Sequence, residues 1–142
     1  VLNFESRGGH AWETRGQSRG GSIVFEPPAG RGFGGAGTIH HIAWATLYEE
    51  HDAWRERVVN AGVRATPVID RFYFKSVYFR EPGGILYELA SIGPGFATDE
   101  PEDSLGEKLA LPPDFEPLRA QVEPLLTPLP DIRQWRPAPT RS

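Results

Sequence analysis

The feature that most constrains the fold is the order of element signals between residues 38 and 92: strand, helix, strand, strand, strand. Residues 38–45 are predicted to form the first strand, and residues 47–61 the helix. Gly62 is a suitable helix stop, because glycine adopts the left-handed conformation at little cost. Three later runs are rich in β-branched and aromatic residues, which favour strands: 66–70, 72–80 and 85–91. One such βαβββ unit leaves a sheet face uncovered, so we expect it to pack against another unit.

Within the predicted helix, Thr46 and Glu49 form a capping-box pattern at the N-terminal end. Apolar residues recur at helical spacing and define the packing face, namely Ala53, Trp54, Val58 and Ala61. His51 lies away from that face, and we expect it to be exposed.

The rest of the chain divides by composition. Residues 1–28 are polar and glycine-rich, with a clear strand at 22–26, and are expected to be the last strands of a preceding βαβββ module. Residues 29–37 form a glycine-rich linker. Residues 93–142 form a proline-rich tail, in which 114–126 has the spacing of a short amphipathic helix. Methionine is absent, even at position 1, so we expect a processed chain or part of a longer protein.

Charge and residue usage exclude several classes of function. The formal net charge of −4 argues against nucleic-acid binding, which calls for a basic face. There are no cysteines, which excludes disulfides, zinc–thiolate sites and cysteine nucleophiles. No apolar run approaches the length of a membrane span and no signal-peptide pattern opens the chain, so a cytoplasmic protein is expected.

Two adjacent histidines stand in the first predicted strand. Neighbouring residues on a strand point to opposite faces, so His40 and His41 cannot both face one pocket. His41 shares its face with two alanines, which leave room for a ligand, whereas His40 shares its face with Ile42 and Trp44. We therefore assign metal binding to His41 and a packing or supporting role to His40. The alternative is that both imidazoles are simply satisfied by hydrogen bonds.

A lone carboxylate, Glu88, stands in the last predicted strand. Buried charges in strands are normally paired or bound to metal. Together with a histidine, a glutamate provides two-thirds of the 2-His-1-carboxylate site of non-haem iron oxygenases. A structural ion pair with Arg71 or Arg80 is the other interpretation of Glu88.

Three further residues precede the last turn. Arg71, Tyr73 and Tyr78 could orient a substrate or relay protons, because an arginine stabilises a developing oxyanion and a tyrosine donates a hydrogen bond. Composition alone favours a simpler interpretation, in which the two tyrosines are ordinary strand residues and the arginine lies at the edge of the sheet.

Three runs of sequence carry a family resemblance: GTIHHIAW, ATPVIDRFYFKSVYFREPGGILYELAS and GPGFATDEPEDSLGEKLALPPDFEP. Together they resemble the C-terminal part of the hydroquinone-type ring-cleaving dioxygenases of the vicinal oxygen chelate superfamily. The resemblance implies an α+β fold of paired βαβββ modules, each pair forming a cupped mixed sheet around a divalent metal. It also implies cleavage of a hydroquinone or catechol by O₂, with Fe(II) as the metal and Mn, Ni or Zn as alternatives.

By this resemblance, His41 and Glu88 are metal ligands. His40, Arg71 and Tyr78 match residues that line the substrate site and are expected to take part in catalysis. Tyr73 is expected to bind substrate because of its place in the same strand run, not because of the resemblance. The family's remaining histidine ligand lies in the first module, and no equivalent is visible here. We expect the missing ligand to come from a complementary N-terminal half or from a homodimer, unless the chain is an inactive fragment. The competing functions are a glyoxalase-like metal-dependent isomerase acting as a homodimer and a module that binds aromatic drugs without catalysis.

Overall fold

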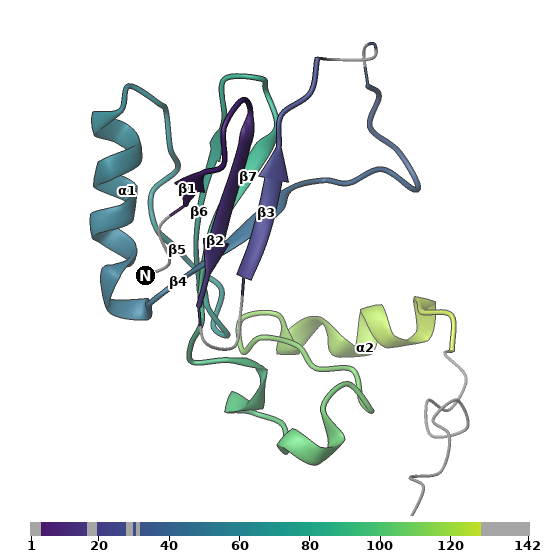
Figure 1. Ribbon diagram of the computed structural model, residues 1–142. Helices are drawn as coiled ribbons and strands as arrows, with labels where there is room; N and C mark the ends of the chain where they lie inside the picture. Colours follow the sequence, from purple (N-terminus) through teal and green to yellow (C-terminus); the bar gives the residue numbers. More distant parts are fainter. Residues whose placement is uncertain (1–3, 17–19, 28–29, 31, 129–142) are drawn as a thin grey trace, which may run out of the picture.

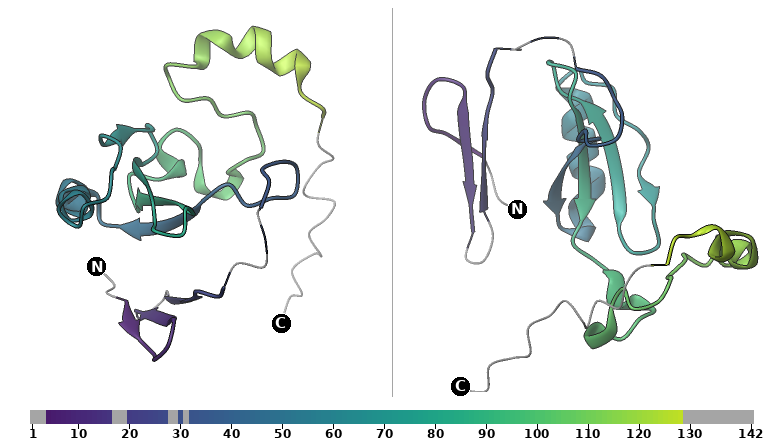
Figure 2. Two further views of the ribbon diagram at one scale, coloured as in Figure 1. Left: turned by 90° about the horizontal axis from the view of Figure 1, so that it is seen from above. Right: turned by 90° about the vertical axis from the view of Figure 1, so that its right-hand side faces the viewer.

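The computed structural model describes residues 4–16, 20–27, 30 and 32–128, which form two β-sheets and one principal helix (Figure 1). The smaller sheet is antiparallel, with strands β1 (Glu5–Ser6), β2 (Ala11–Arg15) and β3 (Gly20–Val24). The larger sheet has the strand order β4-β7-β6-β5. Its strands are β4 (Ile42–Thr46), β5 (Ile69–Asp70), β6 (Lys75–Arg80) and β7 (Leu86–Ser91). Figure 2 shows the smaller sheet as a separate layer beside the larger one.

The larger sheet is mixed, which confirms the predicted α+β class. β4 runs parallel to β7, whereas β6 is antiparallel to both β7 and β5. A parallel pair needs a crossover, and α1 (His51–Asn60) provides it. β6 and β7 form a hairpin whose turn is held by Glu81, because its carboxylate accepts hydrogen bonds from the backbone N–H groups of Gly83 and Ile85.

Several strands are shorter than predicted. β4 begins at Ile42 rather than residue 38, so both histidines lie in the segment that leads into it. The run predicted over 66–70 is reduced to β5, with one isolated bridge from Ala65 to Phe79. β6 begins at Lys75 rather than residue 72, because the preceding residues turn back on themselves. There the Arg71 N–H donates to the Phe74 carbonyl at 2.8 Å, and Phe72 has a φ of +69°.

The start of the helix also differs from the prediction. A 3₁₀ turn (Tyr48–Glu50) precedes α1, and neither helix start has a side-chain cap, so the predicted capping box is wrong. Thr46 instead places its hydroxyl 2.8 Å from Nδ1 of His51. His51 is fully buried, which contradicts the expected exposure. The predicted stop is confirmed, since Gly62 follows the helix with a φ of +82°.

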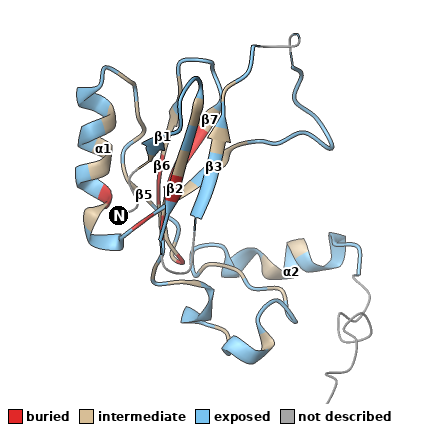
Figure 3. Cartoon of the chain, viewed as in Figure 1, coloured by how far each residue is buried: buried red, intermediate tan, exposed pale blue. Residues whose placement is uncertain are grey.

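The core lies along β6 and β7, where buried residues concentrate (Figure 3). Its apolar members are Val77, Tyr87 and Leu89 on these strands, and Tyr73 in the turn before β6. Burying a side chain such as Val77 completely contributes about 1.5–3 kcal/mol. These two strands pair with each other, so the core fixes the part of the sheet that carries Glu88.

The tail is less regular than predicted. Two 3₁₀ turns (Phe96–Thr98 and Glu102–Ser104) follow the sheet. The predicted helix over 114–126 is divided into a 3₁₀ turn (Glu116–Leu118), α2 (Arg119–Val122) and a second 3₁₀ turn (Glu123–Leu125). Its apolar residues stay largely open, with Phe115 at 55% and Leu125 at 83% exposure. Residues 129–142 of the tail lie outside the described residues.

Across the described ranges, none of the helices combines the length and the apolar character that crossing a bilayer requires.

Candidate metal centre

The structure brings His41 and Glu88 together. Ala43 is the direct partner of Glu88 in the parallel pair of β4 and β7, and His41 lies two residues before Ala43 on the same side of the chain. Nε2 of His41 stands 2.8 Å from Oε2 of Glu88. The glutamate side chain is 5% exposed and the imidazole 33% exposed, so a buried carboxyl oxygen faces a partly open ring.

The second carboxylate oxygen of Glu88 has its own partner. Ser76 on β6 donates its hydroxyl hydrogen to Oε1 at 2.6 Å, and its side chain is fully buried. The arginine alternative for Glu88 is wrong in this structure. Arg80 donates to the Gly84 carbonyl, and the Arg71 guanidinium lies over the ring of Tyr78.

His40 is exposed, which contradicts a packing role in the core. Its Nδ1 lies 2.9 Å from Nδ1 of His41, so one hydrogen must lie between the two rings. In a neutral His41 whose Nε2–H donates to Glu88, Nδ1 accepts from His40. A cation on Nε2 would move the His41 proton to Nδ1 and reverse this bond, which is how such a neighbour selects a tautomer.

Tyr78 and Arg71 border the pair. Tyr78 is the direct partner of Glu88 across the β6–β7 ladder, so both side chains lie on one face. Its ring meets the His41 ring edge to face, with centroids 6.0 Å apart. The Arg71 guanidinium carbon is 5.8 Å from the centre of the Tyr78 ring, which places a positive charge beside the aromatic wall of the site.

Tyr73 is engaged elsewhere. Its hydroxyl donates to Oδ2 of Asp99 at 2.9 Å, and its ring packs against Phe72 and Phe96. Burial, followed by the Asp99 carboxylate, raises the pKa of Tyr73 to about 12. The contacts that the structure gives for Tyr73 therefore tie the tail to the sheet and do not bring it to His41 or Glu88.

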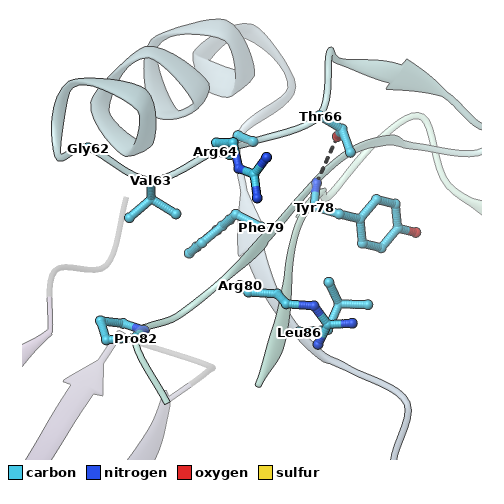
Figure 4. A pocket seen from close by; sticks show the side chains of 10 residues that line it. Gly62, Val63, Arg64, Thr66, Tyr78, Phe79, Arg80, Pro82 and Leu86 are labelled. Carbon is cyan, nitrogen blue, oxygen red and sulfur yellow. Dashed lines mark hydrogen bonds between the residues drawn. The ribbon is translucent and has the colours of Figure 1, made fainter. Parts of the chain in front are cut away.

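A cavity of about 640 Å³ lies between the segment that follows α1 and the β6–β7 hairpin, and Tyr78 is part of its lining (Figure 4). Arg64 and Arg80 contribute guanidinium groups to its wall, and the Tyr78 backbone N–H donates to the Thr66 hydroxyl at 3.0 Å. Neither His41 nor Glu88 lines this cavity. Tyr78 is thus the residue shared between the cavity and the His–Glu pair.

The pair suits a divalent cation in donor type and spacing. Two ligands about 2.1 Å from an ion, in adjacent octahedral positions, lie about 3.0 Å apart. The observed 2.8 Å between Nε2 and Oε2 is close to that value. The set is incomplete in number, because the part of the chain that the structure describes holds no group of three His, Cys, Asp or Glu residues that could bind a metal. His40 does not complete it, since it contacts the opposite side of the His41 ring.

Ser76 was missed by the sequence interpretation. A serine in a strand carries no chemical signal of its own, and its distance to Glu88 depends on the β6–β7 register. The only available hint was the alternation that places Ser76 on the same strand face as Tyr78.

Comparison with known proteins agrees with this architecture. Residues 4–89 match the Glyoxalase/Bleomycin resistance protein/Dioxygenase superfamily. The chain is 50% identical over 108 residues to the "Putative ring-cleaving dioxygenase MhqO" of Bacillus subtilis (strain 168), covering 75% of this chain and 34% of that protein. It is 34% identical over 91 residues to the "Chlorohydroquinone/hydroquinone 1,2-dioxygenase" of Sphingobium indicum, covering 62% of this chain and 28% of that protein.

A solved structure gives the same picture. The crystal structure of a "putative dioxygenase" from Bacillus subtilis superposes with a TM-score of 0.76 at 41% identity, over 91% of this chain and 43% of that one. The chain spans about a third of the length of the curated relatives it matches. The match over residues 4–89 and the βαβββ sheet confirm the resemblance noted in the sequence. The chain belongs to the Glyoxalase/Bleomycin resistance protein/Dioxygenase superfamily.

Proposed function

We propose that this chain forms the βαβββ metal-binding module of a ring-cleaving dioxygenase, with His41 and Glu88 as two of three protein ligands to Fe(II). The observation that carries the proposal is the 2.8 Å approach of Nε2 to a buried carboxylate oxygen. The relatives' names support a dioxygenase, and the name of the Sphingobium protein supports hydroquinones, with catechols as the related class. When bound, Fe(II) would supply Lewis-acid and oxygen chemistry.

The residues around the pair have roles that follow from their positions. The Tyr78 ring provides a flat wall against which an aromatic substrate can stack beside His41. The Arg71 guanidinium, held over that wall, attracts an ionised phenolic oxygen. His40 is exposed and bonded to Nδ1 of His41, so it can hold the His41 ring in the tautomer that leaves Nε2 free for the cation. Both atoms of O₂ are retained in the product as one ring carbon–carbon bond breaks.

The remaining ligand would come from outside the described residues, supplied by a second copy of the chain or by a complementary N-terminal half. Solution mass measured with and without Fe(II) distinguishes these sources. A metal-dependent shift to twice the monomer mass supports the second copy, whereas metal binding only after a separate N-terminal half is added supports the other.

The experiment that tests the function is anaerobic loading with Fe(II), followed by oxygen-electrode recordings with hydroquinone and catechol. We expect O₂ uptake by the wild type in its metal-binding assembly, and its loss in His41→Ala and Glu88→Ala. His10→Ala, at an exposed turn of the smaller sheet, is the matched histidine control and should keep wild-type uptake. Absence of uptake with every hydroquinone and catechol, in every assembly, would refute the proposal.

A further inference from the structure

Glu88 is a flexible side chain whose two oxygens have separate partners. Oε2 faces Nε2 of His41, and Oε1 accepts the hydroxyl hydrogen of Ser76 at 2.6 Å. A separation of 2.6 Å is short for a hydroxyl donor and lies within the range of about 2.5–2.7 Å that is typical of hydroxyl–carboxylate bonds. Ser76 thereby binds one oxygen of Glu88 and leaves the other oxygen facing His41.

The sheet itself places Ser76. Ser76 pairs with Ala90 of β7 and with Ile69 of β5, so its backbone is held from both sides. Glu88 is the diagonal neighbour of Ser76 on the same face of β7, within reach of a long side chain. Ala90, the direct partner, has only a methyl group, and this leaves room for the Glu88 carboxylate to reach the hydroxyl.

From this geometry we propose that Ser76 is a positioning residue, which holds Glu88 by Oε1 so that Oε2 is presented to the cation beside His41. The inference rests on the proposed metal site and adds to it a residue that sets the orientation of the carboxylate ligand. Such hydrogen bonds behind a ligand commonly change metal affinity about 10- to 100-fold. Ser76 is fully buried, so its hydroxyl is out of contact with bulk solvent.

The test measures Co(II) affinity by anaerobic titration, with the visible absorption of the bound ion as a second signal of ligand geometry. The full chain is used, in the assembly that binds metal. Ser76→Ala should bind Co(II) about 10- to 100-fold more weakly and change the absorption spectrum. Ser76→Thr retains the hydroxyl and should recover most of the affinity. Ser22→Ala, on exposed β3, is the matched control and should bind as the wild type does.

A double-mutant cycle separates positioning from general structural damage. The Glu88→Ala background is titrated up to Co(II) concentrations at which its weaker binding is measured. There, where no carboxylate remains to be held, Ser76→Ala should cause no further loss of Co(II) affinity. A loss of equal size in both backgrounds would show that Ser76 acts on the fold rather than on Glu88, and would overturn the inference.

The two proposals fail in different ways. Unchanged Co(II) affinity and spectrum in Ser76→Ala, alongside binding by the wild type, overturns the role of Ser76 and leaves the metal site standing. Absence of Co(II) and Fe(II) binding by the wild type in every assembly overturns both.

Discussion

His51 is a titratable side chain that the folded protein keeps out of water. It is fully buried at the start of α1, and burial is the main reason that its pKa lies below the ordinary value of 6.5. The unfolded chain therefore binds a proton at a higher pH than the folded chain does. Well above pH 6.5 both states are largely unprotonated, and His51 does not change the stability. As the pH falls below 6.5, protonation favours the unfolded state and stability decreases.

The stability of the protein should therefore fall with decreasing pH because of His51. Between pH 7 and pH 5 the wild type should lose melting temperature more steeply than His51→Gln, whose side chain does not titrate. Thermal unfolding in matched buffers measures the two slopes. His10→Gln, changed at an exposed position, should keep the wild-type slope. Equal slopes in the wild type and His51→Gln would contradict the prediction.

Tyr73 provides the second prediction. Its buried hydroxyl donates to Asp99, and Tyr73→Phe removes that bond while keeping the ring packing. Urea unfolding should show a loss of about 1 kcal/mol, the usual net value of such a bond. Tyr48→Phe is the control, because Tyr48 is 42% exposed and should change stability little. A stability loss that is no larger than in the control would show that the Asp99 bond is unimportant.

Much of the candidate site could be predicted from the types of its residues. Strand alternation separated His41 from His40, and the structure does place His41 beside Glu88. The role of these two residues as ligands remains a prediction. The Ser76 contact could not be foreseen, because it depends on which residues of β6 and β7 face each other. The burial of His51 was missed, since the pattern of apolar residues says nothing about a polar side chain bonded to Thr46.

At the scale of elements, Gly62 ends the crossover helix in a left-handed conformation that side chains disfavour. Gly62→Ala should lower the free energy of unfolding by about 1 kcal/mol, although a Cβ there would meet no neighbour. Differential scanning calorimetry measures the change. Gly32→Ala is the matched control, since it also has open space but no positive φ, and it should have little effect. Equal effects of the two substitutions would exclude backbone strain as the cause.

Element types were predictable, while element ends were set by local geometry. The βαβββ order came from residue types alone and is confirmed. The capping-box pattern failed because the Thr46 hydroxyl bonds to the His51 ring instead of the helix backbone. The tail helix was overestimated, because the apolar spacing ignored Pro117 and Pro124, which stand at the starts of its two 3₁₀ turns.

At the scale of the whole molecule, the two sheets meet through aromatic side chains around a cavity of about 570 Å³. Phe4 packs edge to face on Trp44 of β4, with ring centroids 4.7 Å apart. Phe4→Ala should shift tryptophan emission to longer wavelength and lower stability by about 1–2 kcal/mol. Phe115→Ala is the control, because Phe115 lies in the tail at 55% exposure. Unchanged emission and stability would mean that this contact does not hold the sheets together.

The metal centre was the least predictable part at this scale. A single sequence identifies residue types, but a three-ligand site depends on groups brought together from distant parts of an assembly. The described residues supply only two donors, His41 and Glu88. The resemblance indicated that a third ligand comes from another module, and no spacing within this chain could have located it.

The parallel alignment of β4 with β7 affects the order of events during folding. Tyr87 of β7 pairs with Phe79 of β6 across a short hairpin turn. Its other partner, Ile42 of β4, is separated from it in the sequence by the crossover helix and by β5 and β6. Closing that long loop is the entropically demanding step, so the hairpin is expected to form early and β4 to dock late. His41 enters with β4. An ion bound between His41 and Glu88 would link β4 to β7. It would therefore slow the dissociation of β4 from the sheet more than it slows the opening of the β6–β7 hairpin.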